Sequence, residues 1–136
     1  MSLHLEIVTP ERTVFSGPVG NVYMPGSNGE MGVLEGHAAL ITALEPGELR
    51  YEQGGQIHTL AVGSGFAEIT QQRVNLLTDM ALGEDEIDEA QAEEAMKRAQ
   101  EKLAKISHSD DAEDLSHLRA TIAKSMAQLN LKRRMH

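Results

Sequence analysis

The chain has 136 residues, enough for one ordinary domain or two small ones and too few for an enzyme with separate cofactor and substrate domains. Twelve Lys and Arg against 21 Asp and Glu give a net charge of −9, so we expect no binding to nucleic acid or to an anionic lipid surface. Cysteine is absent, which excludes disulfides, thiolate metal sites and thiol nucleophiles. No run of residues is long and apolar enough for a membrane span, and residues 1–10 lack the pattern of a signal peptide, so we expect a soluble protein.

Glycine and proline divide the chain into two parts. All four Pro and all 12 Gly lie at or before Gly83, and no residue after it breaks a helix. The first part therefore favours short strands joined by tight turns, and the second favours helices. We expect a β-sandwich over residues 1–84 and a helical hairpin over residues 85–136.

The first strand is indicated by Leu3, Leu5 and Ile7, which alternate with more polar positions as they do in a strand with one buried face. A turn at residues 10–11 follows. Further strands are predicted at 12–16, 19–24, 31–34, 40–43, 48–53, 56–62, 66–70, 74–78 and 80–82. The pair Gly54-Gly55 is typical of a two-residue hairpin turn. About ten short strands without intervening helices predict an antiparallel β-sandwich or a flattened barrel, with an aliphatic core because aromatic residues are only 3% of the chain.

Beyond Gly83 the apolar residues recur at helical spacing. Asp85 and Asp88 are spaced as in a helix cap, and Asp110 is placed to cap a second helix after a polar loop at 107–111. The first apolar stripe is Ala92, Met96, Ala99, Leu103 and Ile106, and the second is Leu115, Leu118, Ile122, Met126 and Leu129. Two such helices predict an antiparallel hairpin. Its alanine-rich seam buries little apolar area, so we expect that the hairpin can detach or rearrange.

Charge is sorted along this hairpin. Residues 84–98 hold seven acids and two bases, whereas residues 115–136 hold no acid and five bases, namely Arg119, Lys124, Lys132, Arg133 and Arg134. One interpretation is that the last three bases complement the negative end of the helix dipole. The other interpretation is a movable cationic helix that exchanges between acidic protein surfaces.

Catalytic patterns are weak. Gly63-Ser64-Gly65 is not a nucleophile elbow and predicts a bulge or corner instead, and the stretch 26–29 lacks the Lys that ends a phosphate-binding loop. The six histidines show no metal-binding spacing. His37, in a glycine-rich loop, is retained as a candidate contact residue, although a histidine held by backbone hydrogen bonds is the better explanation. We therefore expect no catalytic residues and no metal site.

The stretch 29–47, which reads GEMGVLEGHAALITALEPG, resembles the signature of the epsilon subunit of rotary proton-translocating (F-type) ATP synthases. Residues 3–10, 14–17 and 63–66 and the pair Ile87-Asp88 support the resemblance, which extends from Leu3 to about Leu103. The family pattern has Pro on both sides of Gly-His-Ala, where this chain has Glu35 and Ala39. This departure affects the rigidity of the loop.

The resemblance implies a non-catalytic subunit of the central stalk. Its sandwich would bind the gamma subunit and touch the membrane rotor ring, with Glu30, Met31, Gly32 and His37 at the ring contact. Its C-terminal helix would extend toward the catalytic alpha and beta subunits and inhibit ATP hydrolysis, with the five bases as the inhibitory charges. The expected location is peripheral, on the cytoplasmic face of a bacterial plasma membrane.

Some members of that family bind ATP through an Ile/Leu-Asp-x-x-Arg-Ala motif on the hairpin. Asp88 matches the motif, but Gln91 stands at the arginine position, so a charge that would pair with phosphate is missing. We expect weak or no ATP binding and no other cofactor. Two alternatives stay open from the residues alone: a free-standing adaptor whose cationic helix binds an acidic protein, and, with less support, a small hydrolase.

Overall fold

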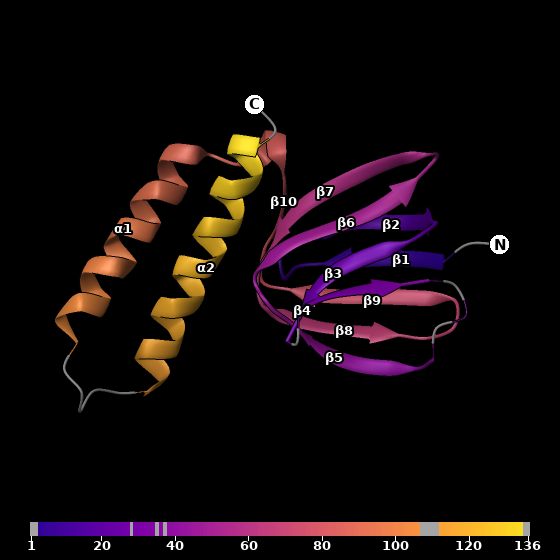
Figure 1. Cartoon of the computed structure of the whole chain (residues 1–136), viewed down its shortest axis with the longest axis horizontal. Coiled ribbons are helices and arrows are strands. Elements are labelled where there is room, and N and C mark those ends of the chain that lie inside the picture. The colour runs from indigo at the N-terminus through magenta and orange to yellow at the C-terminus, as the bar shows by residue number, and fades with distance from the viewer. Residues whose placement is uncertain (1–2, 28, 35, 37, 107–111, 135–136) are drawn as a thin grey trace.

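The computed structural model describes residues 3–27, 29–34, 36, 38–106 and 112–134. One continuous ten-stranded sheet folds over on itself as a sandwich, and two helices stand side by side at one end of it (Figure 1). The strands are β1 (Leu3–Val8), β2 (Thr13–Val19), β3 (Val22–Gly26), β4 (Gly29–Val33), β5 (Leu40–Leu44), β6 (Gly47–Gln53), β7 (Gln56–Val62), β8 (Gly65–Ile69), β9 (Arg73–Thr78) and β10 (Ala81–Gly83). The predicted β-sandwich and hairpin architecture is confirmed.

Alternating side chains build the core, as the first strand predicted. Leu3, Leu5 and Ile7 are fully buried, and the residues between them are half-buried. The core is mostly aliphatic, with a small aromatic contribution from Tyr51, whose ring centroid lies 4.5 Å from that of Phe15. Burial raises the pKa of the Tyr51 phenol.

Turn chemistry explains where several strands end. Gly54 and Gly55 have φ of +61° and +79° and join β6 to β7, which confirms the predicted two-residue hairpin turn. The strand predicted at 12–16 extends further, because β2 continues through Pro18 to Val19. Proline is tolerated there because β2 is the last strand of the sheet and its outer edge needs no amide donor.

The sheet order is β10-β7-β6-β3-β5-β8-β9-β1-β2, with β4 paired to β3. The pairs are antiparallel except that β1 and β9 run in parallel, with Leu5 opposite Val74. The all-antiparallel expectation is wrong at this one pair. Because β1 and β9 are distant in sequence, the connection between them is long enough to bring them side by side in the same direction.

The helical part begins with a single 3-10 turn, η1 (Glu84–Glu86), and continues with α1 (Glu89–Lys105) and α2 (Ala112–Arg134). The carboxylate of Asp88 caps α1, because its Oδ1 accepts a hydrogen bond from the Gln91 amide at 3.0 Å. Asp85 lies inside η1 and does not cap α1, contrary to the expected arrangement. The predicted cap at Asp110 lies outside the described residues.

Helix α2 lies between α1 and the sandwich and contacts both (Figure 1). A helix with two partners needs more than one apolar stripe. The single stripe predicted for it is therefore incomplete, since Ala127 and Leu131 are buried against the sandwich. The predicted stripe also includes Met126, and this prediction is wrong because the Met126 side chain is 48% exposed.

Candidate functional site

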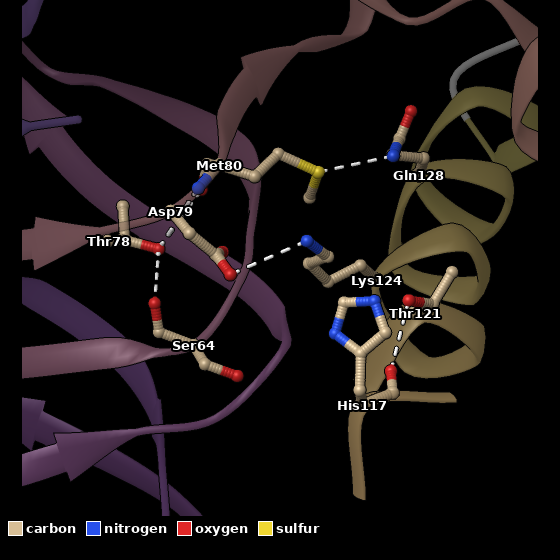
Figure 2. Close-up of polar contacts among 8 residues, drawn as sticks. All are labelled: Ser64, Thr78, Asp79, Met80, His117, Thr121, Lys124 and Gln128. Carbon is tan, nitrogen blue, oxygen red and sulfur yellow. Dashed lines mark hydrogen bonds and ion pairs between the residues drawn. The ribbon is translucent and has the colours of Figure 1, made fainter. Parts of the chain in front are cut away.

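The candidate site is the contact between α2 and the sandwich, and it starts from a corner of the sandwich. Residues 63–64 connect β7 to β8, which begins at Gly65, as the corner interpretation predicted. The Asp79 amide donates to the Ser64 carbonyl at 3.1 Å. The Thr78 hydroxyl oxygen lies 3.1 Å from the Ser64 carbonyl oxygen and 3.2 Å from the Met80 carbonyl oxygen. These bonds hold Asp79 facing α2 (Figure 2).

Asp79 meets Lys124 of α2 at this corner. Lys124 Nζ lies 3.4 Å from Asp79 Oδ2, and the Gln128 amide nitrogen lies 3.1 Å from the Met80 sulfur (Figure 2). A Cβ at position 63 would lie 1.9 Å from Asp79 Oδ1 and 2.9 Å from Lys124 Cδ. Gly63 therefore provides the space in which the two side chains meet.

An apolar cluster continues the contact toward the end of α2. Ala127 and Leu131 of α2 are buried with Ala61 of β7 and Ile87, and Met80 and Leu82 pack around them. We call this cluster, together with the Asp79–Lys124 pair, the docking seam. Burying one leucine contributes about 1.5–3 kcal/mol, and an exposed ion pair contributes about 0.2–1 kcal/mol. The cluster with its buried Leu131 is therefore expected to supply most of the docking free energy.

Four of the five bases of α2 that were predicted to be functional form ion pairs with acids when the helix is docked. Arg134 donates two hydrogen bonds to Glu48 of β6, at 2.7 and 2.5 Å, and this bonding raises the pKa of its guanidinium above the usual value. The other pairs are Lys124 with Asp79, Lys132 with Glu84, and Arg133 with Glu89 and Glu93. Arg119 is exposed and forms no ion pair with the part of the chain that the structure describes.

These pairs bear on the two interpretations of the cationic helix. Lys132, Arg133 and Arg134 do lie in the last turn of α2, where the helix dipole favours them. Each also has a specific carboxylate partner on another element, and Lys124, two turns earlier, has one as well. The bases therefore act as docking groups in addition to complementing the dipole.

Three of the residues predicted to meet the rotor ring, Glu30, Met31 and Gly32, lie in β4. Glu30 is the second residue of β4, next to the tip of the β3–β4 hairpin, and pairs with Arg50 of β6, with Nη2 to Oε2 at 2.7 Å. Met31 is half-buried against the core. A Cβ at Gly32 would lie 3.1 Å from the Tyr23 ring, so this position favours glycine. His37 lies outside the described residues.

The residues of the ATP motif have structural roles at the start of α1. Asp88 is the helix cap described above, and Gln91 is exposed in the first turn. Among the described residues, no three His, Asp or Glu side chains gather as a metal site would require. In the same residues, no helix has the length and apolar character needed to cross a bilayer.

Comparison with known proteins identifies the family of the chain. Residues 2–84 match the family model described as the beta-sandwich domain of the ATP synthase delta/epsilon chain, and residues 85–133 match the long alpha-helix domain of the same chain. The chain belongs to the ATP synthase delta/epsilon family. The resemblance read from residues 29–47 is thereby confirmed.

Relatives in this family cover nearly the whole chain. An ATP synthase epsilon chain from Anaeromyxobacter sp. (strain K) is 39% identical over 131 residues, which are 96% of this chain and 98% of the relative. One from Ruthia magnifica is 33% identical over 130 residues, covering 96% of this chain and 92% of the relative. The similarity therefore includes the helical hairpin as well as the sandwich.

Solved structures share the fold. A chain of the Euglena gracilis mitochondrial ATP synthase, in a structure of its OSCP, F1 and c-ring, superposes with a TM-score of 0.76 at 25% identity, over 99% of this chain and 82% of that one. A chain from the central stalk and c-ring of the Tetrahymena thermophila enzyme has a TM-score of 0.61 at 9% identity, over 99% of this chain and 96% of that one, which shows the fold alone.

Sequence reasoning found the bases of α2 but did not pair them with their acidic partners. The acidic run at 84–98 is visible in the sequence as one side of the charge sorting, and three of its members form ion pairs with α2. Asp79 and Glu48 were not singled out. Neither lies in a recognisable motif, and no local pattern marks them as partners of residues 45 and 86 positions away.

Proposed function

We propose that this chain is the non-catalytic central-stalk subunit of a membrane-bound, proton-translocating ATP synthase, and that its helical hairpin restrains ATP hydrolysis. The observation that carries the regulatory part is the docking seam. Its ion pair is partly exposed, with exposed fractions of 28% and 49% for the Lys124 and Asp79 side chains. Exposed ion pairs contribute only about 0.2–1 kcal/mol each, and two of the four buried residues of the apolar cluster are alanines. This small contact favours a hairpin that leaves the sandwich without unfolding it.

When α2 leaves the sandwich, its bases lose their intramolecular partners. Release would free Lys124, Lys132, Arg133 and Arg134, and Arg119 has no ion pair with any described residue. Such a helix would bind acidic segments of the catalytic alpha and beta subunits. The docked state is then the permissive one. The released state is the inhibitory one.

The sandwich offers a separate surface for the gamma subunit. Ile41 of β5, Phe66 of β8 and Leu77 of β9 are 70%, 61% and 59% exposed on the outer face of neighbouring strands, and Phe66 lies directly opposite Leu77. Large apolar side chains gathered in this way are typical of a protein contact surface. None of these three residues belongs to the docking seam, so gamma could bind them whether the hairpin is docked or released.

The ring contact is proposed at the tip of the β3–β4 hairpin, around Glu30. The subunit would then be peripheral to the membrane and attached through the complex, on the cytoplasmic face of a bacterial plasma membrane. Glu30 is 56% exposed, which leaves its carboxylate accessible to a partner.

The test compares the full chain with a chain that ends at Gly83 in ATP hydrolysis by the reconstituted soluble catalytic sector. The full chain is expected to lower the rate, and the shortened chain is expected to bind gamma without lowering it. Equal rates of ATP hydrolysis with both chains, while both still bind gamma, would show that the hairpin does not inhibit hydrolysis. A shortened chain that folds and fails to retain gamma would favour the adaptor alternative.

ATP is proposed to bind this hairpin weakly or not at all. Asp88 is occupied as a helix cap and Gln91 offers no positive charge for a phosphate. Calorimetric titration of the full chain should give no saturable heat with ATP below about 1 mM, an affinity worth about 4.1 kcal/mol. The Gln91→Arg variant is the matched comparison, and a sub-millimolar dissociation constant for the unaltered chain would contradict the proposal.

A further inference from the structure

Four side chains of alternating charge connect α2 to the tip of the β3–β4 hairpin. Arg134 of α2 pairs with Glu48 of β6, and Arg50 of β6 pairs with Glu30 of β4. All four line one open cavity of about 810 Å³ between the helix and the sandwich. The end of α2 and the loop around Glu30 therefore share a single charged surface.

Glu48 and Arg50 are within reach of each other. Leu49 and Tyr51 point into the core, so Glu48 and Arg50 share the outer face of β6. Two positions along a strand are about 7 Å apart, a distance that an arginine side chain spans easily. The Arg50 guanidinium lies 5.1 Å from the centre of the Tyr23 ring, which keeps it on the outer face that also carries Glu48.

We propose that Arg50 exchanges between Glu30 and Glu48 and so couples the position of the hairpin to the charge of the Glu30 loop. With α2 docked, Arg134 occupies Glu48, and Arg50 neutralises Glu30. With α2 released, Glu48 loses Arg134 and takes Arg50. Glu30 is then free to bind a cationic side chain of a partner protein. This proposal rests on the hairpin movement of the proposed function.

The coupling is reciprocal. A cationic partner on Glu30 competes with Arg50 only while the hairpin is docked, so binding of that partner favours release of α2. Removing the charge of Glu30 also favours release of α2. The docked state loses the Arg50–Glu30 pair, whereas the released state keeps Arg50 on Glu48.

The experiment measures the ratio of docked to released hairpin in the full chain by single-molecule energy transfer. Dyes are placed on cysteines at the exposed positions Gln56 and Ser116, which are unique because the chain has no cysteine of its own. All samples carry Lys124→Gln, which weakens docking equally and populates both states. Glu30→Gln is expected to lower the docked-to-released ratio about 1.5-fold to 5-fold. Glu30→Gln in an Arg50→Gln chain is expected to change nothing further.

Glu45→Gln is the matched control. Glu45 lines the same cavity and forms no ion pair with any described residue. The exchange would be overturned if Glu30→Gln left the docked-to-released ratio unchanged. It would also be overturned if Glu30→Gln lowered the ratio equally in the Arg50→Gln chain, or if Glu45→Gln lowered it as much as Glu30→Gln does. A single distance in every sample would instead overturn the movement of the hairpin, and the exchange with it.

Discussion

Replacing Leu131 with alanine is expected to release the hairpin from the sandwich. Leu131 is fully buried in the docking seam against Ala61 and Ile87, and truncation of a buried leucine costs about 2–5 kcal/mol. Even the lower value changes the docked-to-released ratio about 30-fold. Because the lost contacts join α2 to the sandwich, the cost applies to docking and leaves the sandwich core intact.

The measurement is the energy-transfer distance between sandwich and hairpin, with ATP hydrolysis by the catalytic sector as the functional readout. The Leu131→Ala chain should show the released distance and inhibit hydrolysis more strongly than the unaltered chain. Met126→Ala is the control, since Met126 belongs to the same helix and is 48% exposed. Its effect should stay within about 0.5 kcal/mol. Equal docking in the two variants would show that the seam does not hold the hairpin.

Replacing Gly65 with alanine is expected to destabilise the sandwich itself. The added Cβ would lie 1.8 Å from the Leu77 carbonyl oxygen and 2.8 Å from the Thr78 Cα, which are backbone atoms of the paired strand β9. A backbone cannot rotate away as a side chain can, so β8 and β9 must separate at this corner. We expect a loss of about 3 kcal/mol in the free energy of unfolding.

Urea denaturation of the full chain measures this loss. Gly17→Ala is the matched control in strand β2, because its Cβ would find the nearest atom, Phe15 Cζ, at an ordinary 3.4 Å. That variant should change stability by about 1 kcal/mol or less. If Gly65→Ala unfolds at the same urea concentration as Gly17→Ala, the close approach to β9 does not limit stability.

The family and the division of the chain could be read from the sequence because their signals are local. The alternation of Leu3, Leu5 and Ile7 is enough to bury one face of a strand, and Gly54-Gly55 selects a hairpin turn through its own backbone preferences. The change to helical spacing after Gly83 is equally local. Each of these features depends on residues within a few positions of each other.

The partners of the cationic helix were decided by the tertiary structure alone. Arg134 meets Glu48 across 86 positions, and Lys124 meets Asp79 across 45, because α2 lies against β6 and β7 and the corner at Gly63 leaves room for the contact. The parallel pairing of β1 with β9 and the exposure of Met126 have the same origin. Local periodicity determines which residues form strands and helices. The order of the strands and the face that a helix buries depend instead on which surfaces pack together, and that packing is a property of the whole chain.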